Sequence, residues 1–368
     1  MKKFIDQQNM KQSNAADVFN LIRESGKMTR RDIEKQLGMS WGAVSGICAR
    51  LIDEEYVSEV KKDLPTAKGR TPSYLEVNSA EHFAIGIDVN RAGLSAVLVN
   101  LKNHIIGRWT ADSDFSSSSI LTESVISLIE RITESLGSHR IHCIGIAMQG
   151  VVDSESGISY SLPGICGWKT LDVVTPIRKR FEIPTYIEHD PNCILYASKS
   201  DFTKDTMLLR IDNGIGMAAT LNGKIIAKSG IFEIGHTTAV RGGRPCMCGR
   251  RGCLEQYVSM RGIEKASYLE FSRLAELARE GDEKCIGYFD EMAEHLGLCI
   301  SNTARLISLN DVILCGSICE YSDLFLEKLT SYVSENNSDV KISFTDVENA
   351  SFGAALIAIE RSLEQIDV

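Results

Sequence analysis

The sequence lacks three features that would assign it to other classes of protein. It has no run of about 18 apolar residues, so we expect no helix that crosses a membrane. Its start, MKKFIDQQNMKQSN, has lysines but no apolar segment, so we expect no signal peptide and a cytoplasmic location. It also lacks an excess of positive charge: the formal net charge is −9, which excludes a polyanion-binding surface over the whole chain.

The charges that are present are unevenly distributed. Residues 1–78 contain 13 Lys and Arg against 11 Asp and Glu, whereas the rest of the chain contains 27 against 38. A chain of 368 residues that is 43% hydrophobic and 24% charged has the composition of a soluble globular protein of two or three domains. We therefore expect a mildly basic head that meets a polyanion and an acidic body that does not.

Cysteine is plentiful, but only one group of cysteines has a metal-like spacing. Most of the 11 lie singly in apolar runs, as Cys143, Cys299 and Cys315 do, which is typical of reduced core residues. The exception is the segment HTTAVRGGRPCMCGRRGCLE at 236–255, in which three cysteines fall close together behind a histidine.

Three thiols and one imidazole in this segment make a complete tetrahedral zinc set, formed by His236, Cys246, Cys248 and Cys253. The neighbouring glycines let so tight a loop close around an ion, and the arginines beside the cysteines would favour their thiolates. Four protein ligands leave no open position, so we expect a structural Zn²⁺. A disulfide within the group and a metal-free loop are the alternative interpretations.

The head has the pattern of a winged helix-turn-helix. Thr29 and Asp32 resemble a capping box, and Ser40 can cap the next helix, on which Val44, Ile47 and Leu51 recur at helical spacing. A helix, a short glycine turn and a second helix form this motif. The run 56–60 is a plausible strand of a wing, and the Pro-rich and basic segment 61–72 is interpreted as a linker.

The second helix of the motif, Ser40–Ile52, is expected to enter the major groove of operator DNA. Its exposed first residues would contact bases or phosphates, Arg50 and the start of the preceding helix would contact the backbone, and a short basic arm would enter the minor groove. The predicted DNA-binding residues are Arg30, Arg31, Ser40, Trp41, Gly42, Ser45, Arg50, Lys68 and Arg70. The alternative is that these are solvated charges on a protein-interaction module.

From residue 83 onward, short β-rich runs alternate with helical segments in an α/β pattern. Three strands, then strands alternating with helices, occur twice along the chain, which predicts two similar lobes. We assign residues 1–78 to the head, 79–192 to a first lobe closed by a C-terminal helix over 349–368, and 193–348 to a second lobe. A cleft between the lobes would be the natural ligand site.

The motifs together resemble the ROK family, which groups repressors, open reading frames and sugar kinases. The resemblance rests on Glu233–His236 before the cysteine triplet, on Cys253-Leu254-Glu255, on the turn Asp212–Gly216 and on His189–Asn192. The head followed by Gly-Arg-Thr-Pro at 69–72 resembles the repressor branch. The resemblance implies a two-lobed actin-like, ribonuclease H-like ATPase-type fold behind the winged helix-turn-helix.

The resemblance also implies a sugar site beside the metal. Its hydroxyl-binding residues would be Asp190, Glu233, His236 and Glu255, with Gly150 and Asn192 shaping the pocket. Carboxylates suit this task because vicinal hydroxyls are donors as well as acceptors. His236 would hold zinc through one ring nitrogen and contact sugar through the other. Taken singly, the acids are equally well explained as solvated side chains.

The chain departs from the family's kinases at the phosphate-binding turn. Those kinases have Asp-x-Gly-Gly-Thr, whereas this chain has Asp88-Val89-Asn90-Arg91-Ala92, whose side chains stand where glycines would let phosphate approach. A later Gly-Gly is replaced by Cys315-Gly316. Both changes argue against ATP, so Asp190, the general base of the kinases, is predicted to contact ligand without catalysis.

We therefore expect a sugar-responsive transcriptional repressor of carbohydrate metabolism genes, without enzyme activity, that acts as a homodimer or homotetramer on operator DNA. An ATP-dependent sugar kinase with a regulatory DNA-binding head is one alternative, and there Asp190 would be catalytic. A constitutive repressor controlled by a protein partner is another.

Overall fold

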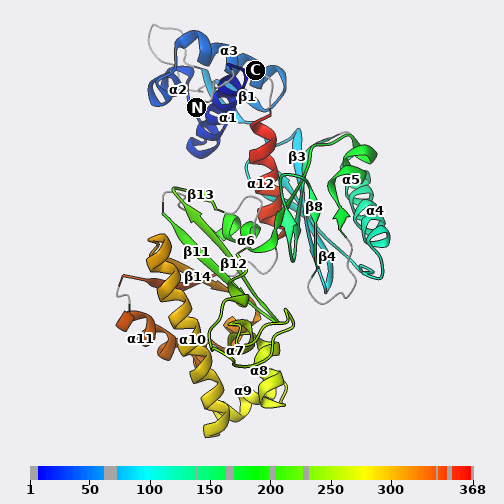
Figure 1. The fold of residues 1–368 in the computed structure, drawn as a ribbon. Helices are drawn as coiled ribbons and strands as arrows, with labels where there is room; N and C mark the ends of the chain where they lie inside the picture. The colour runs from blue at the N-terminus through cyan, green and yellow to red at the C-terminus, as the bar shows by residue number, and fades with distance from the viewer. Residues whose placement is uncertain are drawn as a thin grey trace. The chain divides into compact units, whose positions relative to one another are not determined.

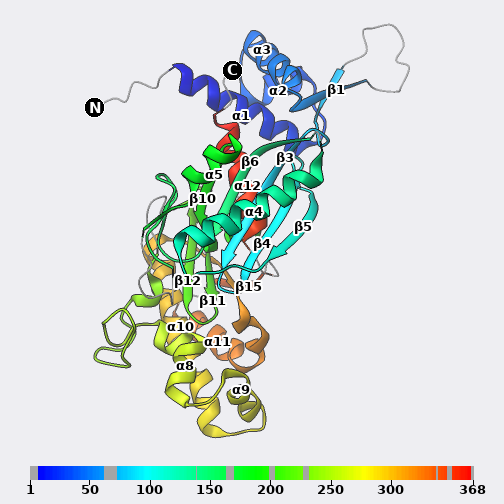
Figure 2. The same cartoon turned by 90° about the vertical axis from the view of Figure 1, so that its right-hand side faces the viewer.

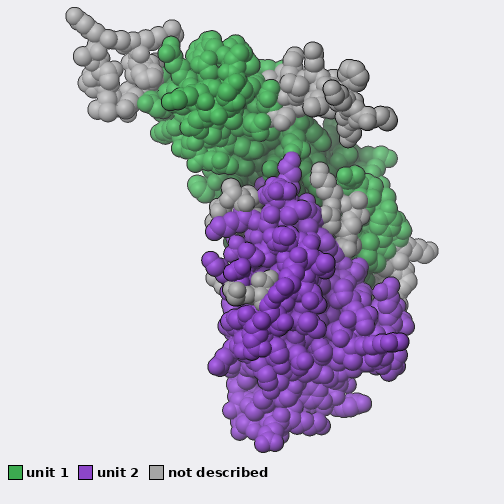
Figure 3. Space-filling view, turned by 60° about the vertical axis from the view of Figure 1, so that its left-hand side comes forward, with its two compact units in different colours: residues 1–188, 351–368 green, residues 189–350 purple. Residues whose placement is uncertain are grey.

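The computed structural model describes residues 7–61, 73–137, 139–162, 170–198, 204–226, 232–336, 339–345 and 350–365. The chain divides into two compact units, unit 1 (Met1–Glu188 with Ser351–Val368) and unit 2 (His189–Ala350) (Figure 3). The sequence analysis put the boundary after residue 192, so the observed division moves Asp190 and Asn192 into unit 2. Among the described residues, no helix is both long enough and apolar enough to span a bilayer.

Unit 1 contains the head, a five-stranded sheet and its covering helices (Figure 1). Its elements are α1 (Gln7–Ser25), α2 (Arg30–Leu37), α3 (Trp41–Asp53), β1 (Val57–Lys61), β2 (Ser73–Val77), β3 (His82–Asn90), β4 (Gly93–Asn100), β5 (Ile105–Ala111), α4 (Ser118–Leu136), β6 (Arg140–Met148), β7 (Val152–Asp153), β8 (Ile158–Ser159), β9 (Leu171–Asp172), α5 (Val174–Phe181), β10 (Thr185–His189) and α12 (Ser351–Leu363).

Unit 2 contains a second five-stranded sheet and the segment with the predicted zinc ligands. Its elements are α6 (Asp190–Ser198), β11 (Thr206–Ile211), β12 (Ile215–Leu221), β13 (Lys224–Ile225), the 3-10 helix η1 (Ile234–His236), α7 (Glu255–Val258), α8 (Met260–Ser267), α9 (Phe271–Arg279), α10 (Glu283–Ile307), β14 (Asp311–Cys315), the 3-10 helix η2 (Ser317–Leu324), α11 (Leu326–Asn336) and β15 (Lys341–Phe344).

The predicted helix-turn-helix is present as α2 and α3. The Thr29 hydroxyl accepts from the backbone N–H of Asp32, and the Asp32 carboxylate accepts from that of Thr29, so the capping box is closed in both directions. Ser40 caps α3 through the N–H of Ala43 at 3.4 Å. The inner faces of the two helices meet in a buried cluster of Ile33, Val44, Ile47 and Leu51.

The wing differs from the expectation in one respect. Strand β1 pairs antiparallel with β2, in a register that places Val57 opposite Val77 and Lys61 opposite Ser73. The segment between the two strands, which we interpreted as a linker between domains, therefore joins two paired strands of one small sheet. Lys68 and Arg70 belong to that segment and lie outside the described residues.

The sheet of unit 1 has the strand order β10-β6-β3-β4-β5 and a different cover on each face. Because side chains alternate along a strand, Ile85 and Ile87 of β3 face the apolar cluster with α4 and α5, whereas Gly86 faces α12 (Figure 2). A Cβ at Gly86 would lie 1.9 Å from the Ser351 carbonyl oxygen, and one at Gly145 of β6 would lie 2.0 Å from that of Ala354. Bare glycine backbone therefore lets α12 pack directly against the sheet.

Unit 2 repeats this plan, as the sequence predicted. Its sheet has the order β15-β14-β11-β12-β13, and in both units the first strand is antiparallel to the second and parallel to the fourth. Helices α10 and α11 pack an apolar cluster against the strands. The sequence analysis gave no prediction for α8, α9 and α10, which fill the chain between residues 260 and 307.

A small polar and aromatic cluster joins the head to the sheet of unit 1. The Tyr56 hydroxyl lies 3.1 Å from Nδ1 of His142, and the Ser362 hydroxyl of α12 lies 2.7 Å from its Nε2. The Tyr56 ring stacks on His82 with 4.5 Å between ring centroids, and Nε2 of His82 lies 2.9 Å from the Glu54 carbonyl oxygen. The position of the head therefore depends on side chains from β3, β6 and α12.

Replacing Gly145 by Ala should destabilise unit 1 by about 3 kcal/mol, because a methyl group at that position overlaps the backbone of α12. All three tryptophans lie in unit 1, so intrinsic fluorescence during urea unfolding reports this unit. Gly46→Ala on the exposed side of α3, in the same unit, is the control; its Cβ meets no atom within 4 Å, and it should raise stability by up to about 1 kcal/mol. Equal effects of the two substitutions would refute the close packing of α12.

The polar and aromatic cluster around His142 should also make the stability of unit 1 sensitive to acid. Burial, with His82 nearby, lowers the pKa of His142 from 6.5 to about 4, so the folded state keeps this ring neutral while the unfolded chain takes up a proton below pH 6.5. This contribution is complete above pH 6.5 and is lost as the pH falls towards 4. It should cost about 2 kcal/mol between pH 7 and pH 5. Tryptophan-detected urea titrations should show this extra loss in the wild type and not in His142→Gln.

Candidate metal centre and ligand site

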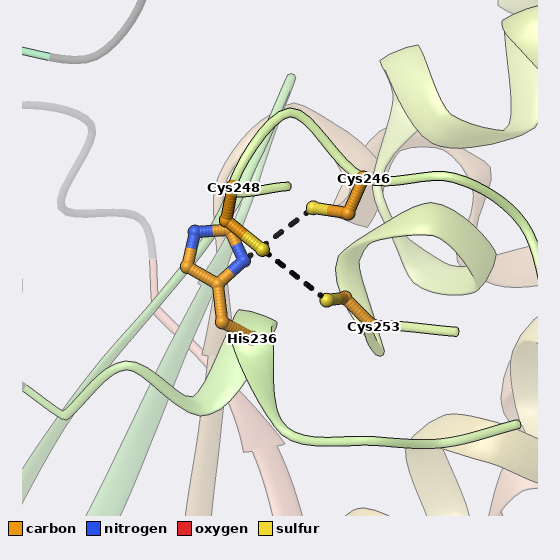
Figure 4. Close-up of side chains that lie close together, drawn as sticks. All are labelled: His236, Cys246, Cys248 and Cys253. Atoms are coloured by element: carbon orange, nitrogen blue, oxygen red, sulfur yellow. Dashed lines mark hydrogen bonds between the residues drawn. The ribbon is translucent and has the colours of Figure 1, made fainter. Parts of the chain in front are cut away.

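The four predicted zinc ligands converge on one point in unit 2 (Figure 4). One ligand atom from each of His236, Cys246, Cys248 and Cys253 lies within 4.8 Å of the others. The Sγ atoms of Cys248 and Cys253 are 3.6 Å apart, as are Sγ of Cys246 and Nδ1 of His236. Sulfur ligands at about 2.3 Å from a tetrahedral ion are separated by about 3.8 Å, so the residues fit zinc.

The chemistry of the three thiols also favours a cation. Burial, together with the neighbouring thiols, raises the pKa of Cys253 to about 12, whereas a hydrogen bond from the Arg250 backbone lowers the pKa of Cys248. Three thiolates this close repel one another unless a positive ion lies among them. The group is thus suited to a metal ion rather than to three free thiols.

The loop that carries the thiols is held in one conformation by its glycines and backbone bonds. A Cβ at Gly252, whose φ is +77°, would lie 1.6 Å from the Val240 carbonyl oxygen. The N–H of Cys246 donates to the Arg250 carbonyl at 2.9 Å, and isolated β-bridges join Thr238 to Cys253 and Pro245 to Arg251. The sequence between the ligands therefore forms a closed loop that brings its two ends together.

Arg244 fastens this loop to the helices of unit 2. Its guanidinium binds the Glu291 carboxylate of α10 at 2.6 Å and the Gln256 carbonyl oxygen at 3.0 Å, and it lies over the Tyr257 ring. Gln256 in turn directs its side-chain amide towards Sγ of Cys246, at 3.6 Å. We expected Arg244 to stabilise the thiolates by its charge; the structure instead pairs it with Glu291, out of the metal centre.

Two predicted ligand-binding acids stand at the two ends of the metal loop. Glu233 precedes η1, and its Oε2 lies 3.7 Å from Nε2 of His236, the ring nitrogen opposite the one beside Cys246. Glu255 begins α7, two residues after Cys253. A Cβ at Gly214 would lie 3.1 Å from Oε2 of Glu255, so the turn after β11 approaches this carboxylate closely.

Asp190 begins α6 in unit 2 and is only 4% exposed. Its Oδ2 accepts from Nη1 of Arg210 at 2.6 Å, and Nε of Arg210 donates to Oδ2 of Asp212 at 2.8 Å. Burial raises the pKa of Asp190 to about 6, since it outweighs the opposing effect of Arg210. Burial also opposes ionisation of Asp212, but Arg210 and the Ser317 hydrogen bonds prevail, and the pKa of Asp212 is lowered.

The two remaining predicted pocket residues lie in different units. Asn192 is buried on α6 beside Asp190, and Gly150 lies in unit 1, with φ of +85°. The sequence analysis missed Arg210, Asp212 and Gln256. An arginine within the apolar strand β11 was the signal that could have revealed the first of these.

In the turn Asp88–Ala92, which we compared with the phosphate-binding turn of the kinases, the side chain of Asn90 binds neighbouring groups of the same turn. Nδ2 of Asn90 donates to the Asp88 carboxylate at 2.9 Å, and Oδ1 of Asn90 accepts from the N–H of Ala92 at 2.9 Å. A backbone N–H that a phosphate would need is thus engaged by the chain itself.

In the head, most of the predicted DNA-binding residues lie on the surface. Ser40, Trp41, Gly42, Arg31 and Arg50 are exposed, with Trp41 48% exposed, and Ser45 is half-buried. Arg30 differs, because its Nη1 is ion-paired with the Glu59 carboxylate of β1 at 2.5 Å.

Comparisons with known proteins agree on one family. The model described as "ROK family" matches residues 84–360. The chain is 26% identical to the xylose repressor of Caldicellulosiruptor bescii over 89% of each chain. It is 22% identical to the DNA-binding transcriptional dual regulator NagC of Escherichia coli, over 96% of this chain and 94% of the relative.

Two solved structures match different shares of this chain. A ROK family transcriptional regulator, described as a homologue of the Escherichia coli MLC protein, superposes with a TM-score of 0.87 at 21% identity, over 97% of both chains. A ROK family glucokinase from Streptomyces griseus superposes with a TM-score of 0.63 at 20% identity, over 99% of its own chain but only 76% of this one. The fold shared with the glucokinase therefore omits about the length of the head.

Cys248→Ser should reduce the zinc content from about one ion per chain towards zero, because it removes one of four tetrahedral ligands. It should also lower the melting temperature of unit 2, since the loop loses the ion that joins its ends. Zinc release measured with a colorimetric chelator, together with calorimetry, tests both effects. Cys299→Ser, in the same unit but outside the ligand group, is the control and should keep the full zinc content. Full zinc content in Cys248→Ser would refute the ligand set.

Proposed function

The chain belongs to the ROK family, and from this premise we propose that it is a sugar-responsive transcriptional repressor of carbohydrate metabolism genes. One observation carries the proposal: a complete helix-turn-helix head is joined to a kinase-like fold in which Asn90 fills the phosphate turn. The xylose repressor matches 89% of this chain, and the dual regulator NagC matches 96% of it, which leaves too few residues unmatched to omit the head. A catalytic function would need the phosphate turn that the chain has lost.

The metal centre supports the ligand site without taking part in chemistry. We assign His236, Cys246, Cys248 and Cys253 as ligands of a structural zinc, which supplies cross-linking between the two ends of the loop when it is bound. His236 uses Nδ1 for the metal and turns Nε2 towards Glu233. Gln256 stabilises the Cys246 thiolate from outside the ligand set, as neighbouring hydrogen-bond donors do in other metal sites.

The effector is a sugar or sugar derivative held by carboxylates. Asp190, Glu233 and Glu255 present acceptors for hydroxyl donors, and such charge-assisted hydrogen bonds are stronger than neutral ones. Asn192 and Gly150 remain predicted neighbours of the ligand. A sugar that binds one conformation of the protein better than another shifts the population towards it, and this difference in affinity sets the size of the response.

The head binds double-stranded operator DNA through α3. The exposed N-terminal end of α3, at Ser40, Trp41 and Gly42, is the part of a recognition helix that reaches base edges. We assign Arg31 and Arg50 to contacts with phosphates. We assign Lys68 and Arg70, from the segment between β1 and β2, to the minor groove. A two-fold operator calls for a dimer or a pair of dimers, in which two heads bind successive half-sites.

A mobility-shift assay with the chain's own promoter tests this function. The operator affinity should fall at least about tenfold when the cognate sugar is added, which corresponds to about 1.4 kcal/mol of coupling. D-xylose, D-glucose and N-acetyl-D-glucosamine form the first panel. Asp190→Asn should keep operator binding and lose the response, because the amide places a donor where the hydroxyl needs an acceptor. Asp323→Asn, at the surface of unit 2, is the control.

Two outcomes would contradict the proposal. No change in operator affinity with any sugar would refute the effector and favour control by a protein partner. ADP release with a hexose, abolished by Asp190→Asn, would restore the kinase alternative.

A further inference from the structure

Arg210 occupies a position that neither the metal centre nor the predicted sugar contacts explain. It projects from β11, a strand that is otherwise apolar and largely buried, and its side chain is 16% exposed. Two nitrogen atoms of its guanidinium bind two carboxylates: Nη1 donates to Asp190, and Nε donates to Asp212. Asp212 is fixed on its other side, since its Oδ1 accepts from the backbone N–H and the hydroxyl of Ser317 at 2.7 and 2.9 Å.

These contacts hold one carboxylate oxygen of Asp190, Oδ2, whereas the other, Oδ1, is not bound by Arg210. Oδ2 is taken by the guanidinium at 2.6 Å, whereas Oδ1 lies 3.6 Å from Nε2 of His189, beyond hydrogen-bond distance. A carboxylate held through one oxygen by a planar, permanently charged group has a set orientation. Arg210 thus orients Asp190 and favours its ionised form against the opposing effect of burial.

We propose that Arg210 is the positioning residue of the effector site, which holds Asp190 as an ionised acceptor for a hydroxyl of an uncharged sugar. The inference rests on the proposed function. The guanidinium is already bound to two carboxylates of the chain, so it is not arranged to receive the phosphate of a sugar phosphate. Asp212, Glu233 and Glu255 add further negative charge in the same unit, which disfavours an anionic ligand.

The charge state of Asp190 gives the proposal a measurable signature. The titratable or charged groups that face it are His189 beside it in the chain, Arg210 and Asp212 of and after β11, and Cys315 of β14. Strand β12, which packs on α6, has no titratable side chain. Burial raises the pKa of Cys315 to about 12, so this thiol stays neutral, and Arg210 and Asp212 are the groups that shift the titration of Asp190 in opposite directions.

Sugar affinity should therefore follow the ionisation of Asp190. In the wild type, affinity for the sugar of the panel that binds best should decrease as the pH falls through about 6, where Asp190 takes up a proton. Arg210→Met should move this midpoint up by about 1–3 pH units, because the opposite charge is gone. At pH 7 its affinity should be about twofold weaker for a shift of one unit and about tenfold weaker for a shift of two units, with recovery towards pH 9.

A second variant should move the midpoint the other way. Asp212→Asn removes the negative charge that opposes Asp190 and leaves Arg210 in place, so the midpoint should fall below that of the wild type. Arg279→Met is the matched control: it removes a comparable pair, with Asp323 at 2.8 Å, from the surface of unit 2 and should leave the midpoint unchanged. Isothermal titration calorimetry from pH 5 to 9, with zinc content and melting temperature for every variant, makes the comparison.

The results separate the proposal from the function on which it rests. If no sugar binds the wild type, the proposed function fails and the inference fails with it. If the wild type binds sugar but Arg210→Met loses affinity equally at every pH, or not at all, Arg210 has a structural role only. Tighter binding of D-glucose 6-phosphate than of D-glucose overturns the assignment to an uncharged sugar. If Arg210→Met does not fold, the downward shift in Asp212→Asn decides the matter.

Discussion

The convergence of three thiols and one imidazole on a single point is the constraint on which the ligand side of unit 2 depends. It fixes the two ends of the 18-residue segment from His236 to Cys253, and a carboxylate lies just beyond each end, Glu233 before the first ligand and Glu255 after the last. Arg244 and Glu291 then tie the closed loop to α10. The two acids that we predict to bind ligand are thus placed by the same closed loop that brings the four predicted zinc ligands together.

Sequence reasoning succeeded where the signal was local. The Thr29–Asp32 capping box, the Ser40 cap and the cysteine spacing each lie within a few residues, and the repeated strand pattern depends on runs of β-formers. It failed where partners are distant. Arg210, for example, binds the carboxylate of a residue 20 positions away in the sequence. Helix α10 is a different case: it was overlooked although its signal is local, since Phe289, Met292, Leu296 and Ile300 recur at helical spacing. The second strand of the wing was missed because only its pairing with β1 defines it.

The solved glucokinase and the solved regulator both superpose on this chain, but only the regulator also covers the length of the head. In the function that we propose, Asp190 at the start of α6 and the acids beside the metal loop would bind a sugar, as carboxylates can in a kinase or in a regulator. We expect the two functions to separate at the turn Asp88–Ala92, since Oδ1 of Asn90 accepts from the Ala92 N–H, a donor that would otherwise be open to an anion. Loss of catalysis thus needs no change of architecture.

The close seat of α12 on Gly86 and Gly145 has a consequence for how the protein is made on the ribosome. Unit 2 is continuous in sequence, whereas unit 1 is interrupted by it and receives α12 only after unit 2 has been synthesised. Unit 2 can therefore fold while the sheet of unit 1 still lacks the cover over its glycine face. Ser362 of α12 also binds His142 in the cluster that joins the head to the sheet, so this cluster is completed only after translation has passed unit 2 and reached α12.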